Sequence, residues 1–232
     1  MKVARYRYRG KQSIGVIDGD AIVPAGDDLL APRPAGEPIA LSAVDLLSPV
    51  GRGAKIICVG LNYADHAAES GDPPPPEPLI FAKLPNSLIG ASENIRLPDF
   101  SDQVDFEAEL GVVIARRTSK VTATDARSYV FGYTCVNDVS ARDLQFGDGQ
   151  WTRGKSLDTF CPVGPWVVTA DEVPDPQTLG IRCVLNGEVM QESDTALMLF
   201  GVDALVSYIS QGITLEPGDL IATGTPPGVG FA

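Results

Sequence analysis

Residues 104–115 read Val104-Asp105-Phe106-Glu107-Ala108-Glu109-Leu110-Gly111-Val112-Val113-Ile114-Ala115, an apolar run entered through alternating acids. This run predicts a strand over 106–115. Successive side chains of a strand point to opposite faces, so Glu107 and Glu109 share one side, while Phe106, Ala108 and Leu110 face the core. Two neighbouring carboxylates repel each other unless a cation is bound or one pKa is raised. The alternative interpretation is an ordinary solvent-facing strand.

A third acid, Asp138, ends another apolar strand, predicted over 130–137. Three carboxylates at strand ends supply half of an octahedral Mg²⁺ shell and leave positions for water and substrate oxygens. The chain has one histidine, so a metal site must be built almost entirely from oxygen ligands, which favours Mg²⁺ or Mn²⁺ over Zn²⁺. Glu107, Glu109 and Asp138 are therefore the candidate metal ligands.

That single histidine, His66, lies three residues before Glu69. If residues 62–69 are helical, this spacing places imidazole and carboxylate on one face, where the carboxylate raises the basicity expected of a general base. The four prolines at 73–76 cannot continue the helix, and so short a helix is marginal alone. The segment is typical of a lid that orders over a ligand and equally of an ordinary surface turn whose histidine has no function.

The charge of the chain restricts its partners. With a net charge of −12 and a pI near 4.4, the protein is not expected to bind nucleic acid or anionic membranes. An anionic substrate then requires a local cationic pocket or a bound cation. Arg142, Gln145 and Lys155 are candidates to hold a carboxylate or keto oxygen. In the alternative, Arg142 and Lys155 form structural ion pairs with Asp143 and Asp158.

Near the end of the chain, residues 222–230 form a Gly-rich loop after a strand. The loop lacks the lysine and spacing of a P-loop, and no βαβ context supports a dinucleotide site. Its amides and the Thr225 hydroxyl are suited to binding a carboxylate.

The rest of the chain predicts a β-rich fold. Its 24 Gly and 19 Pro indicate many turns. Residues 1–50 are predicted to form a small N-terminal domain and residues 51–232 the main domain. Strands are expected at 2–8, 13–18, 21–24, 55–60, 79–83, 106–115, 130–137, 165–169, 180–185 and 220–223, and helices at 43–47, 123–129 and 201–210.

No apolar run reaches the length of a membrane span, and no signal peptide is recognised, so we expect a cytoplasmic protein. Cys58 and Cys135, in apolar runs, are predicted to be buried reduced thiols.

Several ordered blocks together make the chain resemble the fumarylacetoacetate hydrolase family. They are residues 59–66, 106–110, 137–143, 153–160, 185–188 and 217–226, within a match from Lys55 to Gly230. The resemblance implies a mixed β-roll with a small N-terminal domain, usually dimeric. It implies Mg²⁺ or Mn²⁺ on the three acids and a water-activating dyad of His66 and Glu69 on a mobile lid. Lys155, Arg142, Gln145 and Thr225 match substrate-holding positions.

The resemblance also implies a set of reactions on small anionic keto acids. Family members hydrolyse acylpyruvates, decarboxylate oxaloacetate, or isomerise and decarboxylate dienedioates such as 2-hydroxyhepta-2,4-diene-1,7-dioate. The sequence predicts metal-dependent carbon–carbon bond cleavage, with Lys155 placing positive charge near the enolate. Two alternatives stay open: the dienedioate isomerase, and a non-catalytic, metal-stabilised binding protein of the same fold. Relatives continue for a strand pair beyond Gly-Val-Gly, so the C-terminal end is expected to be truncated.

Overall fold

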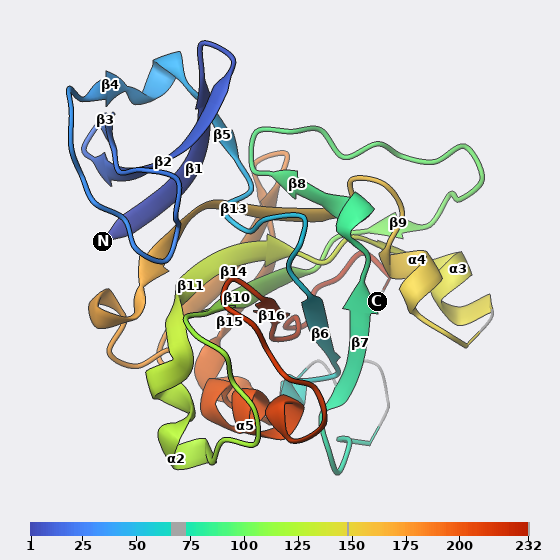
Figure 1. Cartoon of the computed structure of the whole chain (residues 1–232). Coiled ribbons are helices and arrows are strands. Elements are labelled where there is room, and N and C mark those ends of the chain that lie inside the picture. Colours follow the sequence, from blue (N-terminus) through green and yellow to red (C-terminus); the bar gives the residue numbers. More distant parts are fainter. Residues whose placement is uncertain (66–72, 148, 232) are drawn as a thin grey trace.

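The computed structural model describes residues 1–65, 73–147 and 149–231 (Figure 1). The strands are β1 (Lys2–Tyr8), β2 (Lys11–Asp18), β3 (Ala21–Pro24), β4 (Ile39–Ala40), β5 (Asp45–Leu47), β6 (Ile56–Gly60), β7 (Leu79–Lys83), β8 (Leu88–Gly90), β9 (Val104–Asp105), β10 (Ala108–Ile114), β11 (Val130–Asn137), β12 (Ser140–Ala141), β13 (Cys161–Thr169), β14 (Gly180–Leu185), β15 (Glu188–Asp194) and β16 (Leu220–Ala222). The α-helices are α2 (Ala123–Ala126), α3 (Arg142–Gly147), α4 (Thr152–Lys155) and α5 (Val202–Gly212). Short 3₁₀ helices are η1 (Leu41–Ala43), η2 (Pro85–Ser87), η3 (Arg127–Tyr129), η4 (Ala170–Glu172) and η5 (Thr195–Leu197).

One large sheet dominates this mixed α+β fold. Its strand order is β4-β3-β2-β1-β13-β11-β10-β16-β6-β7, with β5 added to β1 and β8 added to β13. Most neighbours are antiparallel, but β16 and β6 are parallel, as are β13 and β8. The β-rich α+β fold predicted from the sequence is therefore confirmed.

The central strands are buried on both faces, which explains their continuous apolar sequence. On β6, Ile56 and Cys58 belong to one core cluster, whereas Ile57 and Val59 belong to the other. The first cluster extends toward β1 and β2, and the second packs under α5 (Figure 1). The sheet therefore separates two cores and holds the ends of its central strands in fixed positions.

Helix α5 closes the second core with one apolar stripe. Val202, Leu205, Val206 and Ile209 recur at helical spacing, and all are buried in the second cluster. The side-chain amide oxygen of Gln177 accepts the N–H of Val202 at 2.8 Å, which satisfies a backbone donor at the beginning of the helix. The predicted helix at 201–210 is thus confirmed; it begins one residue later and ends two residues later than predicted.

The strands predicted at 2–8, 21–24, 79–83, 130–137 and 180–185 are confirmed with the same bounds. The predicted helix at 43–47 is wrong. Residues 41–43 form a 3₁₀ turn, and Asp45–Leu47 form β5, which pairs with β1. Pairing with an adjacent strand overrides a weak local preference in so short a segment.

The N-terminal strands continue the large sheet, because Lys2 and Val3 of β1 pair with Val168 and Val167 of β13. The division into a domain at 1–50 and a domain at 51–232 stays a prediction. No helix in the described ranges is long and apolar enough to cross a membrane.

All four cysteines are free thiols. Cys58 is buried as predicted, but Cys135 is exposed. The prediction for Cys135 is wrong because its neighbours on β11, Thr134 and Val136, take the buried positions of that part of the strand.

Candidate metal and active site

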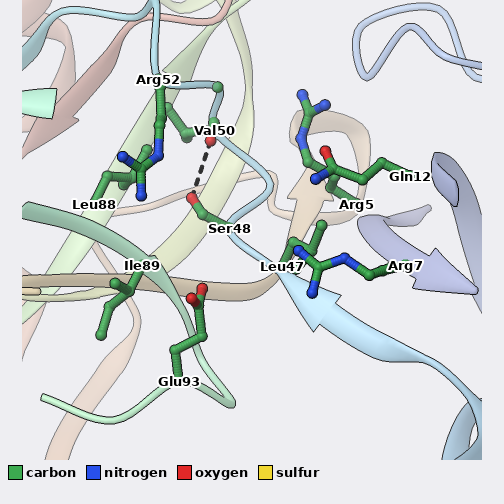
Figure 2. Close-up of a pocket in the computed structure, with 11 residues that line it drawn as sticks. Arg5, Arg7, Gln12, Leu47, Ser48, Val50, Arg52, Leu88, Ile89 and Glu93 are labelled. Carbon is green, nitrogen blue, oxygen red and sulfur yellow. Dashed lines mark hydrogen bonds between the residues drawn. The ribbon is translucent and has the colours of Figure 1, made fainter. Parts of the chain in front are cut away.

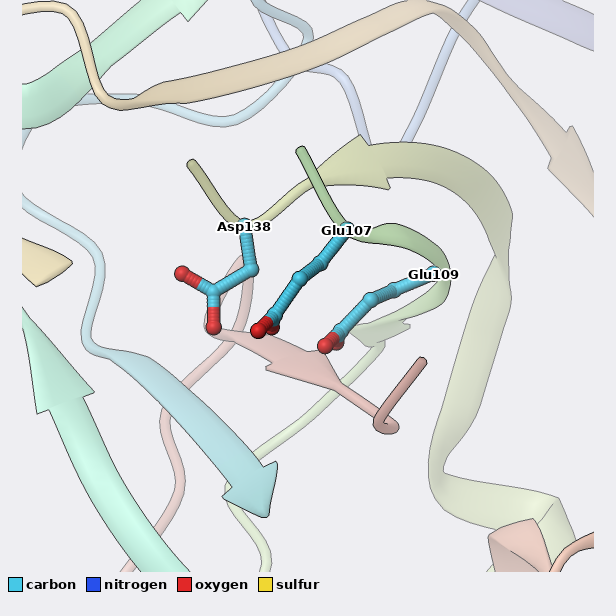
Figure 3. Close-up of side chains that lie close together, drawn as sticks. All are labelled: Glu107, Glu109 and Asp138. Atoms are coloured by element: carbon cyan, nitrogen blue, oxygen red, sulfur yellow. The ribbon is translucent and has the colours of Figure 1, made fainter. Parts of the chain in front are cut away.

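The three candidate metal ligands converge at the joined ends of β10 and β11 (Figure 3). In the antiparallel register Ala108 lies opposite Asn137, and the N–H of Asp138 donates to the carbonyl oxygen of Glu107 at 2.9 Å. This register brings Asp138 beside Glu107, and Glu109 follows on the same side of the chain. One oxygen atom from each carboxylate lies within 4.8 Å of the others, and all three residues are buried.

The burial of this strand is the reverse of the expected alternation. Glu107 and Glu109 are 6% and 3% exposed, whereas Phe106, Ala108 and Leu110 are only partly buried. Of the three apolar residues predicted to face the core, Leu110 packs against the second core cluster, but the two acids are more deeply buried than all three. Since isolated buried carboxylates are strongly destabilising, the acids must be balanced by cations.

Lys155, at the end of α4, is the first of these cations. Its Nζ donates to Glu107 Oε2 at 2.7 Å and to Asp138 Oδ2 at 2.9 Å, and its side chain is 2% exposed. Burial alone lowers the pKa of Lys155, but the charges of Asp138 and Glu107 outweigh it and raise the pKa above its ordinary value. Lys155 therefore stays positively charged between two of the candidate metal ligands.

Arg142, the first residue of α3, forms a second set of ion pairs. Its Nε and Nη2 donate to Asp105 Oδ2 at 2.9 and 2.7 Å, and its Nη1 donates to Glu107 Oε1 at 2.6 Å. The same Nη1 donates to Gln145 Oε1 at 2.9 Å. Arg142 thus positions both the Glu107 carboxylate and the Gln145 amide.

Lys83, the last residue of β7, completes the cationic side. Its Nζ donates to Asp138 Oδ1 and to the carbonyl oxygen of Val139, and its side chain is fully buried. Burial tends to raise the pKa of Asp138, but the charges of Lys155 and Lys83 outweigh it and keep that pKa below its ordinary value. Asp138 is therefore ionised and held from both sides.

Glu109 is the carboxylate of this cluster that none of the three cations pairs with. Four buried carboxylates (Asp105, Glu107, Glu109 and Asp138) face three buried cations (Lys83, Arg142 and Lys155), a difference of one negative charge.

Among the described residues no ion pair reaches Glu109, which accepts only the N–H of Gly224, at 2.9 Å. Burial, reinforced by Asp138 and Glu107, raises its pKa well above the ordinary value. Glu109 therefore needs either a proton or a bound cation, and the three convergent carboxylate oxygens, of which it supplies one, fit a hard divalent cation.

The Gly-rich loop after β16 forms the wall beside Glu109. Thr225 Oγ1 donates to the carbonyl oxygen of Ala108 at 2.9 Å and accepts from Gln191 Nε2 at 2.8 Å. Gly224 has a φ of +97°, and a Cβ there would lie 2.7 Å from Cβ of Asn62. Only glycine fits this close approach, which aims the Gly224 N–H at Glu109.

Asn62 connects this wall to the segment that contains the predicted dyad. Its side-chain amide donates to the carbonyl oxygens of Phe200 and Thr223 at 3.0 and 2.7 Å. His66 and Glu69 lie outside the described residues, so their role stays a prediction. The described chain brings together Glu107, Glu109, Asp138, Arg142, Gln145, Lys155 and Thr225.

The alternative that pairs Arg142 and Lys155 with Asp143 and Asp158 is wrong. Asp143 accepts from the hydroxyl of Ser101 at 2.7 Å, and Asp158 accepts from the amide of Asn86 at 2.8 Å. Neither acid is a partner of Arg142 or Lys155, whose ion pairs are made with the acidic cluster.

Sequence reasoning missed Lys83 and Asp105. Lys83 ends the apolar run Leu79–Lys83, and this position is a signal because a charge that becomes buried there needs a partner. Asp105 continues the alternation of Glu107 and Glu109, so the three acids share one face of the chain. Neither signal identifies the partner, which depends on the pairing of distant strands.

Family models match both parts of the chain. The model described as fumarylacetoacetate (FAA) hydrolase C-terminal matches residues 55–232, and the model described as Rv2993c-like, N-terminal matches residues 1–49. The chain is 52% identical over 191 residues to the mitochondrial oxaloacetate tautomerase FAHD2A of Bos taurus. That alignment covers 82% of this chain and 61% of the bovine protein, so the match spans about three fifths of this relative.

Solved structures agree in fold. The 2-hydroxyhepta-2,4-diene-1,7-dioate isomerase of Mycobacterium marinum is 41% identical, with a TM-score of 0.89 over 99% of this chain and 89% of that one. Maleylpyruvate hydrolase of Sphingobium sp. SYK-6, solved with manganese(II) and pyruvate, is 31% identical, with a TM-score of 0.82 over 99% and 90%. With most of its length matched by the family model and an acidic cluster at the ends of its central strands, the chain belongs to the fumarylacetoacetate hydrolase family of enzymes.

Proposed function

We propose that this protein is a divalent-metal-dependent enzyme that forms the enol or enolate of a small α-keto dicarboxylic acid, with oxaloacetate as the first candidate substrate. The observation that carries the proposal is the buried cluster of Glu107, Glu109 and Asp138 with Lys155 inserted between two of its carboxylates. Mg²⁺ and Mn²⁺ are the candidate metals, because all the donors are carboxylate oxygens.

The relatives support this substrate class. The bovine protein is named for oxaloacetate tautomerisation, and the Mycobacterium marinum protein for isomerisation of a hydroxydienedioate. Both reactions move a proton between carbon and oxygen next to a carbonyl group. A site that stabilises the intervening enolate therefore serves both, and carbon–carbon cleavage of a β-keto acid releases the same kind of enolate.

When bound by Glu107, Glu109 and Asp138, a divalent cation would supply Lewis-acid polarisation of the keto group. Lys155 places its ammonium group where negative charge grows on the substrate oxygen, and its raised pKa keeps it charged there. In oxaloacetate tautomerisation one proton leaves C3 and one is added at the C2 oxygen. The protonated Lys155 is suited to stabilising that oxygen rather than to removing the C3 proton.

The remaining proposed roles follow from contacts within the cluster. Arg142 holds Glu107 and Gln145 in place, and Gln145 presents its amide N–H groups to a substrate carboxylate. Thr225, whose hydroxyl donates to the carbonyl oxygen of Ala108, is assigned to substrate binding by its place in the Gly-rich loop beside Glu109. The base is assigned to the dyad of His66 and Glu69 on the basis of sequence spacing.

The test follows oxaloacetate by two readouts, with Mg²⁺, with Mn²⁺ and with EDTA. Loss of the enol absorbance reports tautomerisation, and pyruvate release coupled to lactate dehydrogenase reports decarboxylation. Metal-dependent acceleration of either reaction supports the proposal, and the faster reaction identifies the activity. Equal rates with and without protein, although metal is bound, would favour the non-catalytic alternative.

Hydrolysis of acylpyruvates is the second candidate. The relative solved with manganese(II) and pyruvate is named a maleylpyruvate hydrolase, which favours it. In this reaction His66 deprotonates a water that attacks the distal carbonyl, the carbon–carbon bond breaks, and pyruvate leaves as its enolate. Metal-dependent consumption of acetylpyruvate would support a hydrolase; loss of oxaloacetate alone would not.

The proposal includes a homodimer as the working form. Exposed apolar side chains gather on the hairpin β14–β15, where Val184 and Val189 are 52% and 51% exposed. Such a patch is a candidate subunit interface. Light scattering coupled to gel filtration would give twice the chain mass if this is correct, and the single-chain mass if it is not.

A further inference from the structure

A second charged site lies away from the acidic cluster, at the join between the N-terminal strands and the body. A cavity of about 330 Å³ is lined by Arg5, Arg7 and Gln12 from β1 and β2, and by Arg52 from the connection after β5 (Figure 2). No residue that lines it belongs to the acidic cluster. The sheet register explains the grouping, because Arg5 pairs with Leu47 of β5 and Arg7 pairs with Gln12 of β2.

The positive charge of this cavity is poorly balanced. Arg7 has a carboxylate neighbour in Asp45, but Nη1 and Oδ2 are 3.9 Å apart and both side chains are largely exposed, so the pair is weak. The acid that lines the cavity, Glu93, already accepts the N–H of Gly90 at 2.7 Å. Within the described residues, Arg5 and Arg52 form no hydrogen bond or ion pair with any carboxylate.

Arg5 shows the imbalance most clearly. Its Nε is buried and has no hydrogen-bond partner. Burial lowers the pKa of Arg5, and no neighbouring carboxylate offsets the effect. A buried guanidinium N–H without an acceptor is costly, and in a chain of net charge −12 an acid could readily have been placed there. Because Arg5 also lines the cavity, an acceptor bound there would offset the cost at the outer N–H groups of the same guanidinium.

We propose that this cavity binds the phosphoryl group of a small molecule, held by Arg5, Arg7 and Arg52 with help from the Gln12 amide. Guanidinium forks match phosphate oxygens, and three of them suit a dianion better than a single carboxylate. The volume is at the lower end of ligand pockets, which limits the ligand to a small one. The floor is apolar, formed by Leu47, Val50, Leu88 and Ile89, so an organic group attached to the phosphate has a surface to contact.

Isothermal titration calorimetry at constant ionic strength, with Mg²⁺ present throughout, tests the proposal with two probes. Inorganic phosphate supplies the dianion alone, and phenyl phosphate adds an apolar body. Saturable binding of both is expected. Tighter binding of phenyl phosphate would identify an organic phosphate as the ligand, and equal affinities would identify free phosphate.

Variants locate the binding. Arg5→Gln and Arg52→Gln should each weaken it about tenfold or more, as expected for losing hydrogen bonds to a charged group. Arg33→Gln removes the same charge at an exposed position outside the cavity and should bind as the wild type does. Arg52 is exposed, so its variant keeps the fold if Arg5→Gln does not. Absence of saturable binding, or equal affinity in wild type and Arg52→Gln, would overturn the proposal.

Discussion

Replacing Lys155 with methionine should tighten divalent metal binding while it lowers turnover. Lys155 Nζ lies 2.7 Å from Glu107 Oε2 and 2.9 Å from Asp138 Oδ2, two of the three carboxylates assigned to the metal. An incoming ion and the ammonium group therefore compete for the same oxygens. Methionine keeps much of the length and volume of lysine and removes its charge.

The size of the effect follows from Coulomb's law. For an ammonium group and a divalent ion at ~5 Å, an effective dielectric constant of about 20 gives a repulsion of about 6.6 kcal/mol. Lys155 can withdraw along its flexible stem, which relieves much of this repulsion. If about a quarter survives, it corresponds to roughly tenfold in metal affinity. Turnover should fall by about 10²-fold or more, because the positive charge near the enolate oxygen is lost.

Calorimetric titration of metal-free protein with Mn²⁺ measures the first effect, and oxaloacetate turnover at saturating metal measures the second. Lys11→Met is the matched control, since it removes the same charge at an exposed position on β2. Its affinity and turnover should equal those of the wild type. Unchanged or weaker metal binding by Lys155→Met, in a folded protein, would refute the competition between Lys155 and the metal.

Four further changes have defined outcomes. Leu205→Ala should lower the free energy of unfolding by about 2–5 kcal/mol in urea titrations, because Leu205 is fully buried under the sheet; a loss below about 1 kcal/mol would contradict that packing. Gly224→Ala should weaken Mn²⁺ binding as well as stability, since its Cβ would displace the loop that donates to Glu109; wild-type affinity would show that the donor is dispensable. His66→Ala should reduce acetylpyruvate hydrolysis more than oxaloacetate decarboxylation, and equal losses would count against water activation by His66. Burial raises the pKa of Tyr133 to about 12, so the stability that depends on its neutral phenol is fully present below the unfolded pKa of about 10 and is lost as pH rises through 12. Tyr133→Phe should remove this loss of stability in thermal melts at high pH. An unchanged pH profile of the melting temperature would refute the prediction.

The strands of the fold could be predicted where the local pattern agrees with the tertiary structure. Strands β7 and β11 have the predicted bounds, because apolar residues between turn-forming residues are typical of strands. Segment 45–47 could not be predicted, since three residues become a strand only by pairing with β1. The order of the strands, including the parallel neighbours β16 and β6, depends on contacts between residues more than a hundred positions apart.

For the site, the acidic cluster could be predicted from the sequence. Alternating acids at the beginning of β10 and an acid at the end of β11 indicated a carboxylate cluster, and the register of the two strands brings it together. The balance of charge within it was not predictable. That Lys83 contacts Asp138, and that Glu109 is left without a cation, follows from the meeting of β7, β10, β11 and α4.

The central claim is that Glu107, Glu109 and Asp138 bind a divalent cation that the reaction requires. The most direct measurement is a Mn²⁺ titration of metal-free wild type and Glu109→Gln, with oxaloacetate turnover recorded at each metal concentration. The account predicts one Mn²⁺ per chain, with turnover rising in proportion to occupancy, and loss of both in Glu109→Gln although the variant stays folded. Full turnover by the metal-free wild type, or wild-type Mn²⁺ affinity in Glu109→Gln, would contradict it.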